Sequence, residues 1–423
     1  MGTFSQKLKL LFADRSLRNR LLFVVGVLAV FRLLAAMPVP GIDTVQLQAF
    51  FASNQFFGLL NLFSGGGLAN LSIVLLGVGP YITASIIMQV STIMVPRLKQ
   101  LYQEEGEAGR QRFSQYTRML SLPLAVLQGI SFLLILERQG VLPDLSAFQF
   151  GVNLLVVVAG SMFLMWLGEL ISEFGLGNGV SVIIFGGIVA SLPSTVSQAL
   201  FSFVPSQLPI YLAFIAAAVA VVAAVVVVTE AERPVPVTYA KQVRGMKTFG
   251  GSATYLPLRL NQAGVIPIIF ALSLLLVPQM VATFFATSSL VWVAQAANFV
   301  LQGLQHLGIY GLLYFVLVFF FTYFYTAVTF DPHQIAENLQ KNGAFVPGVR
   351  PGSSTVDHLS KVITRITFVG AFFLGLIAVL PIAMQSLTGI QSLTLGGTAL
   401  LIVVSVVLDL SRRIDAQISI REY

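Results

Sequence analysis

Ten apolar segments, each long enough to cross a lipid bilayer, constrain this chain more than any other feature of its sequence. A membrane-spanning helix needs about 20 mostly apolar residues. The segments lie at residues 21–38, 73–95, 119–136, 152–171, 180–204, 209–229, 262–285, 308–329, 364–385 and 394–411. Only 10% of the 423 residues are charged, whereas a soluble domain has about 25%. We therefore predict an all-α polytopic membrane protein with ten transmembrane helices.

The basic residues predict how these helices are oriented. Lys and Arg cluster before the first segment, after the second, sixth and eighth, and after the tenth. The loops after the first, third, fifth, seventh and ninth segments together contain one basic residue, Arg138. Positive charge is enriched in the cytoplasmic loops of membrane proteins. The alternation predicts a multi-pass protein of the cell inner (cytoplasmic) membrane with both termini in the cytoplasm.

The number of segments predicts two inverted halves. A short joint with the sequence FVPSQL, at 203–208, separates the first five segments from the last five. Because five is odd, the second half enters the membrane in the opposite sense, which is the arrangement of an inverted-topology repeat. We expect an N-terminal half at 1–205 and a C-terminal half at 206–423. The second half then carries long cytoplasmic loops at about 231–260 and 331–363.

The sequence lacks the patterns of most membrane enzymes. It contains no cysteine, no H-E-x-x-H, no G-x-S-x-G and no P-loop lysine, which are the patterns of common nucleophile, metal and phosphate sites. Its histidines lie at segment ends or in loops, at His306, His333 and His358. We expect no catalytic residue, no metal site and no cofactor, and we predict that the chain is not an enzyme.

The polar groups inside the segments leave two classes of function open. An ion-coupled transporter usually has ionisable groups at mid-membrane, and Arg32 is the one clearly intramembrane charge here. Its simpler interpretation is a cation bound to carbonyl or acidic groups inside the helix bundle. Amide side chains in membrane helices form hydrogen bonds across helices, so we expect Gln89, Gln128 and Asn261 to act either as fixed contacts or as a latch that opens reversibly. A channel and an inverted-repeat transporter of a small solute both fit this pattern.

Glycine and proline are concentrated in the stretch SGGGLANLSIVLLGVGPYI, at 64–82. Both residues oppose a stable helix interior. This stretch, continued to Gln89, resembles the plug and the second helix of the SecY family. Matching stretches follow in the family's order over nearly the whole chain: EEGEAGRQRFSQYTR at 104–118, FLMWLGELISEFGLGNGVSVIIF at 163–185, YLPLRLNQAGVIPIIFA at 255–271, NLQKNGAFVPGVRPG at 338–352 and GGTALLIVVSVVLD at 396–409.

The resemblance implies a protein-conducting channel. Members of the SecY family form two inverted five-helix halves around a central hourglass pore. Unfolded secretory polypeptides cross the membrane through the pore, and hydrophobic segments leave sideways into lipid through a lateral gate between helices 2 and 3 and helices 7 and 8. The implied partners are the channel subunits SecE and SecG, the motor ATPase SecA, the ribosome, the translocating polypeptide with its signal sequence, and the lipid bilayer.

The resemblance also implies roles for individual residues. An apolar pore ring is implied at Val78, Ile82, Val180, Ile184, Ile269 and Ile402. A short re-entrant plug helix at about 56–71 is implied to include Phe57, Leu60, Phe63, Gly65, Gly66, Gly67 and Leu68. The lateral gate is implied to contain Gln89, Gln128 and Asn261, and the loops that dock the motor or the ribosome to contain Arg244, Lys247 and Arg350. The family ring is mostly isoleucine, so the two valines are smaller than its usual residue.

Overall fold

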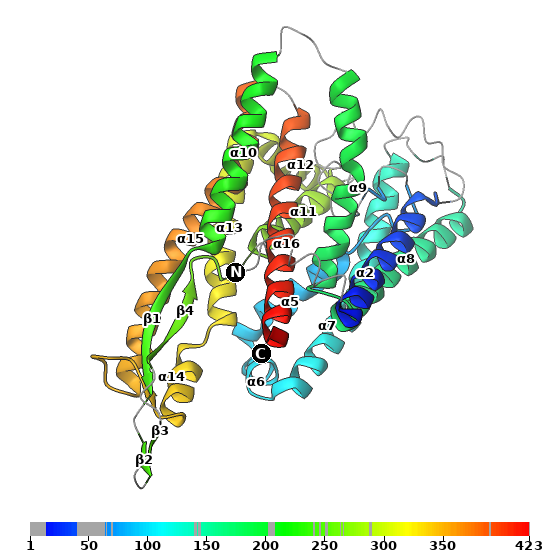
Figure 1. The fold of residues 1–423 in the computed structure, drawn as a ribbon. Coiled ribbons are helices and arrows are strands. Elements are labelled where there is room, and N and C mark those ends of the chain that lie inside the picture. Colours follow the sequence, from blue (N-terminus) through cyan, green and yellow to red (C-terminus); the bar gives the residue numbers. More distant parts are fainter. Residues whose placement is uncertain are drawn as a thin grey trace. The chain divides into compact units, whose positions relative to one another are not determined.

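Helices form most of the computed structural model (Figure 1), and each of the ten predicted segments contains a helix over most of its length. The structure describes residues 14–39, 64, 66–68, 71–138, 142, 145–201, 208–239, 242–244, 247–249, 253–262, 264, 266–286, 290–388 and 391–422. The ten helices are α2 (Arg15–Ala36), α5 (Gly79–Met94), α7 (Gly106–Arg138), α8 (Ala147–Phe174), α9 (Gly179–Phe201), α10 (Leu208–Glu230), α11 (Ile266–Phe285), α13 (Leu307–Thr329), α15 (Ser353–Thr388) and α16 (Gln391–Glu422).

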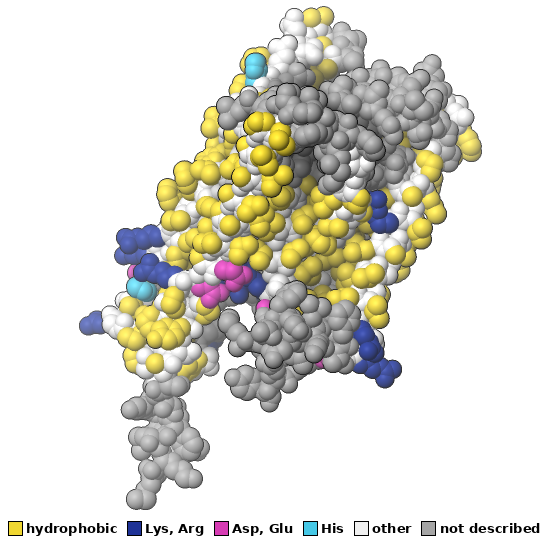
Figure 2. Space-filling view, turned by 45° about the horizontal axis from the view of Figure 1, so that its top comes forward, with side chains coloured by type: hydrophobic (Ala, Val, Ile, Leu, Met, Phe, Trp, Pro, Cys, Tyr) yellow, Lys and Arg dark blue, Asp and Glu magenta, His cyan; other side chains and the backbone are white. Residues whose placement is uncertain are grey.

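Several of these helices suit a membrane by length and composition. Within the described residues, five are long and apolar enough to cross a bilayer: Arg15–Ala36, Gly106–Glu137, Ala147–Phe174, Leu307–Lys341 and Ser353–Met384. A bent pair of helices raises this to six if it is counted as one span. Figure 2 shows a broad hydrophobic surface over the helices, interrupted by few charged side chains. The polytopic membrane class is therefore confirmed, while the count of ten crossings stays a prediction.

The bent pair consists of α5 and the short helix α6 (Pro96–Gln103), whose axes differ by 114°. Val95, between them, has extended backbone angles of φ −117° and ψ 104°. A residue before proline avoids the helical region, and proline has no N–H to continue the helix. Pro96 therefore ends the second predicted segment and turns the chain sharply. Two further short helices are α12 (Val291–Gln305) and α14 (Pro332–Lys341).

The chain forms two compact units. The first comprises Met1–Tyr211, Leu272–His306 and Thr388–Tyr423, and the second comprises Leu212–Ala271 and Leu307–Leu387. These units reflect contact density, whereas the predicted halves at 1–205 and 206–423 reflect repeat symmetry. The division into inverted halves therefore stays a prediction, and each unit is described by itself.

Close approaches to α8 in the first unit require glycine. A Cβ atom at Gly160 of α8 would collide with the carbonyl oxygen of Ile73, and one at Gly179 of α9 would collide with the carbonyl oxygen of Gly168. Ser161 Oγ donates to the carbonyl oxygen of Gly77 at 2.8 Å. Small residues allow helices to approach closely in membrane proteins. The same unit has an apolar core that includes Leu68, Leu71, Leu75, Phe132, Leu136, Val157 and Leu142.

The second unit contains a small antiparallel sheet beside its helices. Its strand order is β4 (Ala253–Arg259), β1 (Glu232–Tyr239) and β5 (Ala344–Phe345). The side chains of Val235 and Val237 are buried on one face of β1. Pro234 and Pro236 lie in the part of β1 that pairs with β4 alone, because β5 pairs only with the last two residues of β1. A missing N–H is tolerated where one edge of a strand is unpaired.

A second, two-stranded sheet consists of β2 (Gln242–Arg244) and β3 (Lys247–Phe249). Both sheets lie in the segments predicted to be long cytoplasmic loops. The sequence did not predict these strands, because strands this short have little pattern of alternating hydrophobicity. The all-α class of the membrane part is unaffected.

Candidate functional site

The residues of the predicted pore ring are mostly buried. Val78 and Ile82 lie at the start of α5, Val180 and Ile184 lie on α9, and Ile402 lies on α16, all in the first unit. Ile269, on α11, belongs to the second unit. Val180 is half-buried, and the other five side chains are at most 5% exposed. The ring itself stays a prediction, since its members belong to two units.

The start of α5 differs from the sequence prediction in an informative way. The predicted segment begins at residue 73, but residues 73–78 form turns and the helix begins at Gly79. Gly77 has a positive φ of 57°, which a helix does not accept, and Pro80 occupies the first turn, where its missing N–H costs nothing. Val78 is therefore the N-cap residue of α5, at the junction between a turn and a rigid helix.

A tight turn fixes the start of α9 beside α8. The backbone N–H of Gly179 donates to Ser172 Oγ at 2.9 Å, and the N–H of Ser181 donates to Asn178 Oδ1 at 3.2 Å. A Cβ atom at Gly168 would lie 3.4 Å from Val180 Cγ2. The stretch EFGLGNG thus holds Val180 against α8, and Ile184 follows one helical turn later.

The predicted plug lies mostly outside the described residues. Phe57, Leu60, Phe63 and Gly65 belong to the undescribed part, whereas Gly66, Gly67 and Leu68 form turns. Gly66 has a φ of 87°, and a Cβ atom at Gly67 would lie 2.7 Å from Ser72 Oγ. The first glycine therefore serves a backbone conformation and the second serves close packing. Leu68 is 1% exposed, and its N–H donates to Ser64 Oγ at 2.9 Å.

Two backbone hydrogen bonds attach this segment to the end of α2. The N–H of Val39 donates to the carbonyl oxygen of Leu71 at 2.8 Å, and the N–H of Ile73 donates to the carbonyl oxygen of Met37 at 3.0 Å. Pro38 and Ser72 form an isolated antiparallel bridge between these bonds. The chain leaving α2 and the chain leaving the predicted plug are therefore paired as a short ribbon.

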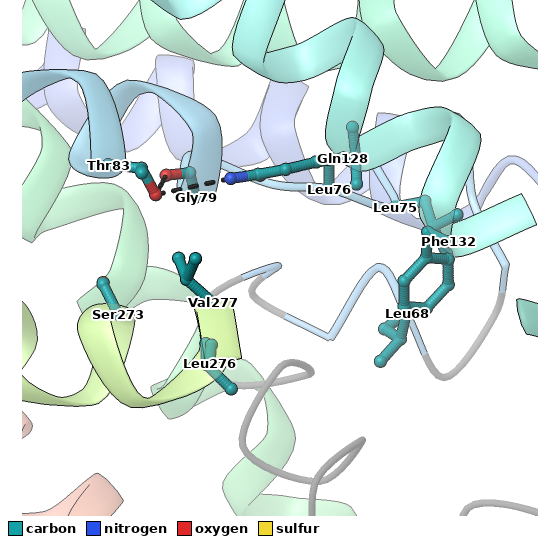
Figure 3. A pocket seen from close by; sticks show the side chains of 10 residues that line it. All are labelled: Leu68, Leu75, Leu76, Gly79, Thr83, Gln128, Phe132, Ser273, Leu276 and Val277. Carbon is teal, nitrogen blue, oxygen red and sulfur yellow. Dashed lines mark hydrogen bonds between the residues drawn. The ribbon is translucent and has the colours of Figure 1, made fainter. Parts of the chain in front are cut away.

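A cavity in the first unit brings a predicted plug residue and a predicted gate residue together (Figure 3). Its volume is about 40 Å³, enough for water. It is lined by Leu68, Leu75, Leu76, Gly79, Thr83, Gln128, Phe132, Ser273, Leu276 and Val277. Gln128 Nε2 donates to Thr83 Oγ1 at 3.4 Å, and Thr83 Oγ1 donates to the carbonyl oxygen of Gly79 at 3.0 Å. Most of the other lining side chains are apolar, so this short chain of bonds stands in an apolar setting.

The other two predicted gate residues make local hydrogen bonds. Gln89 Nε2 donates to Ser85 Oγ at 2.9 Å within α5, and Asn261 Nδ2 donates to the carbonyl oxygen of Gly264 at 3.2 Å. Gln89 Oε1 and Asn261 Oδ1 are buried and accept no hydrogen bond from the described residues. A buried acceptor without a donor costs about 1–3 kcal/mol. Of the three amides, Gln128 alone has a described bond to another helix, and Asn261 belongs to the second unit.

The predicted docking residues lie in the two segments predicted to be loops. Arg244 ends β2 and Lys247 begins β3, and the two are paired in the ladder of that sheet. Arg350 is exposed, and its carbonyl oxygen accepts a hydrogen bond from Thr355 Oγ1 at 2.9 Å. Gly348 and Gly352, on either side of it, have φ values of 82° and 99°. The turn that these glycines form is fixed and presents Arg350 to solvent.

Two pairings had no signal strong enough to be found in the sequence. Thr83 is the partner of Gln128, although its position in PYITASIIM is that of an ordinary residue facing a helix neighbour. Arg118 of α7 forms an ion pair with Glu169 of α8, whose side chain is 18% exposed. Within the described residues, no three His, Asp or Glu side chains come close enough to hold a metal ion.

Comparison with known proteins agrees along nearly the whole chain. The family model SecY matches residues 72–411. Proteins named protein translocase subunit SecY are 40% identical in Mycobacterium bovis and 41% identical in Mycobacterium leprae, over 96% of both chains. The one from Streptomyces coelicolor is 40% identical over 97% of both chains.

Solved structures share the fold at lower sequence identity. One described as a protein-conducting channel superposes with a TM-score of 0.65 at 18% identity, covering 93% of this chain and 91% of the other. Sec61 in a canine ribosome–channel complex gives 0.61 at 18% identity with the same coverage. Because the family model matches residues 72–411 and relatives are 40% identical over 96% of the chain, this chain belongs to the SecY family.

Proposed function

We propose that this chain is the central subunit of a protein-conducting channel, which moves unfolded secretory polypeptides across the membrane and releases hydrophobic segments sideways into lipid. The observation that carries the proposal is the identity of about two residues in five with bacterial SecY proteins over 96% of the chain. Family membership, and not a missing catalytic group, makes it a translocase subunit and not an enzyme. The alternative of a solute transporter has no support from the family.

The proposed pore ring suits this task physically. Its side chains are apolar, at Val78, Ile82, Val180, Ile184, Ile269 and Ile402. A narrow apolar constriction resists ions, because an ion must lose hydrating water there and apolar side chains provide no interaction that compensates for the dehydration free energy. It also offers no hydrogen bond that would hold a passing polypeptide. Within the first unit, the side chains of Val78, Ile82, Ile184 and Ile402 are buried.

The cavity of Figure 3 suggests how the plug and the gate act together. Leu68, in the proposed plug at 56–71, and Gln128, in the proposed gate, line the same small space. Departure of the plug would remove Leu68 from this wall and admit water or an entering peptide beside Gln128. The bond from Gln128 to Thr83 is long at 3.4 Å, and hydrogen bonds of this length are weak. It can therefore break and reform as the gate opens and closes.

The partners and orientation follow from the family and from the charges. We propose SecE and SecG as further channel subunits, and SecA and the ribosome as sources of the translocating polypeptide. Arg244, Lys247 and Arg350 supply basic contacts on two cytoplasmic loops, and Arg350 is the exposed residue of a fixed turn. The basic clusters support cytoplasmic termini in the inner membrane. The inverted halves at 1–205 and 206–423 complete the proposal.

Reconstitution tests this proposal against the transporter. The complex is placed in vesicles with a motor ATPase, ATP and a precursor that carries a signal sequence. Protection of the precursor from added protease, dependent on ATP and on the signal sequence, is the expected result. Uptake of small solutes without precursor protection would contradict the proposal and favour a transporter.

A further inference from the structure

Arg32 is a charged residue in an otherwise apolar helix. It lies one turn before the end of α2, which passes the length and composition test for a membrane span. No other Lys or Arg occurs between Arg20 and Arg97 in the sequence. A cation in such a helix is costly unless it faces polar groups or a water-filled space, and it therefore marks a functional position.

The guanidinium of Arg32 lies against the glycine turn of the predicted plug. A Cβ atom at Gly66 would be 3.3 Å from Arg32 Nη1. Gly66 also has a φ of 87°, which side chains other than glycine rarely adopt. Glycine at this position thus meets two requirements, the backbone conformation and room for the guanidinium.

The turn beside Arg32 is ordered by its own hydrogen bonds. The N–H of Gly67 donates to the carbonyl oxygen of Ser64 at 3.2 Å, and the N–H of Ser72 donates to the carbonyl oxygen of Gly67 at 2.8 Å. Leu68 follows directly, buried in the cavity that it shares with Gln128. The ribbon between 37–39 and 71–73 ties the far end of this segment to α2. This segment therefore has two contacts with the region of α2, one at Arg32 of the helix and one at the residues directly after it.

We propose that Arg32 is a positioning residue that holds the plug closed by its contact with the Gly66 turn. A guanidinium has five N–H donors in a rigid fork and stays charged, which suits the carbonyl groups of a turn. The backbone ribbon beyond Leu71 stays in place when the plug moves, whereas the contact at Gly66 is released. Arg32 is exposed, so no packed side chain has to move for this release. The inference rests on the proposed function, since it assigns a residue to the closed state of that channel.

A cysteine reporter measures this directly, because the chain contains no cysteine. Leu68→Cys places one thiol at a site that is 1% exposed. In vesicles, a water-soluble maleimide labels this thiol slowly while the plug is closed. Adding Arg32→Gln is expected to raise the labelling rate about fivefold, a typical size for coupling between two sites. Arg32→Lys keeps the charge without the fork and is expected to lie between the two.

Arg20→Gln is the matched control, because it removes the same charge from the other end of α2. It is expected to leave the labelling rate unchanged. The inference would be overturned if the thiol were labelled at the same rate with Arg32 as with Arg32→Gln. So would an equal increase with Arg20→Gln, because the effect would then come from net charge.

A second variant keeps the inference testable if Arg32→Gln fails to accumulate. Gly66→Ala strains the backbone at a φ of 87° and also crowds the guanidinium, so it is expected to raise the labelling rate in the same direction. An unchanged labelling rate with Gly66→Ala would overturn the inference.

Translocation in the same vesicles separates this inference from the proposed function. With Arg32→Gln, a precursor with a defective signal sequence is expected to be accepted about fivefold more often, by the same coupling. If the unaltered channel translocates a normal precursor while Arg32→Gln changes neither labelling nor acceptance, the inference about Arg32 alone is wrong. If the unaltered channel translocates nothing with its partners present, the proposed function is wrong.

Discussion

Replacing Gln128 with leucine tests the coupling between the gate and the cavity most sharply. The change removes the 3.4 Å bond to Thr83 and makes the wall facing Ser273, Leu276 and Val277 more apolar. Interhelical hydrogen bonds in membrane proteins are worth about 0.6 kcal/mol on average. A term of that size shifts an equilibrium by about threefold. We expect the closed contact to lose this much when the bond is removed, so a segment needs less hydrophobicity to leave into lipid.

The assay is a graded series of signal-anchor segments, with membrane insertion scored against translocation. Gln128→Leu is expected to move the midpoint of the series toward less hydrophobic segments. Thr83→Val removes the acceptor of the same bond at similar side-chain volume and is expected to move the midpoint in the same direction. The double variant is expected to move it little further, because both changes remove one bond.

Gln115→Leu is the control, since Gln115 is an exposed residue of the same helix, α7. It is expected to leave the midpoint unchanged. The reasoning is wrong if Gln128→Leu and Thr83→Val both give the midpoint of the unaltered channel, or if Gln115→Leu shifts it equally.

Two further predictions concern packing and docking. Gly179→Ala places a methyl group against the carbonyl oxygen of Gly168 and is expected to destabilise the protein by about 1–3 kcal/mol. Gly151→Ala is the control, because Gly151 lies on α8 with open space around it, and it is expected to have little effect on the thermal midpoint in detergent. Equal thermal midpoints for the two variants would contradict the close crossing. Arg350→Glu is expected to abolish motor-driven translocation at normal protein level, whereas Lys361→Glu is expected to retain most of it; an active Arg350→Glu channel would remove the docking role.

The membrane helices could be predicted from the sequence because a bilayer imposes a minimum apolar length. All ten predicted segments coincide with helices, although α5 begins six residues later than expected. Residues 73–78 form turns, and the positive φ of Gly77 is a backbone angle among them that a right-handed helix does not accept. Hydropathy does not register such an angle, since Ile73, Val74 and Leu75 are equally apolar in a helix or in turns.

The sheets and the side-chain pairings could not be predicted for a different reason. β1 carries prolines at 234 and 236, which sequence reasoning assigns to a loop, but its buried Val235 packs in one apolar cluster with Leu258 of β4. Likewise, the contacts of Gln128 with Thr83 and of Arg32 with Gly66 join residues more than 30 positions apart. Their partners depend on how helices pack, and apolar periodicity alone does not determine packing.

The position of a translocating chain relative to Ile82 tests the central claim most directly. Ile82→Cys is the only thiol in a chain without cysteine. A secretory precursor with one cysteine is arrested midway, and a disulfide to residue 82 is sought. The account predicts a disulfide that requires both the motor ATPase and a functional signal sequence. Absence of that disulfide from Ile82→Cys and from Ile184→Cys, while translocation continues, would contradict the account and place the path elsewhere.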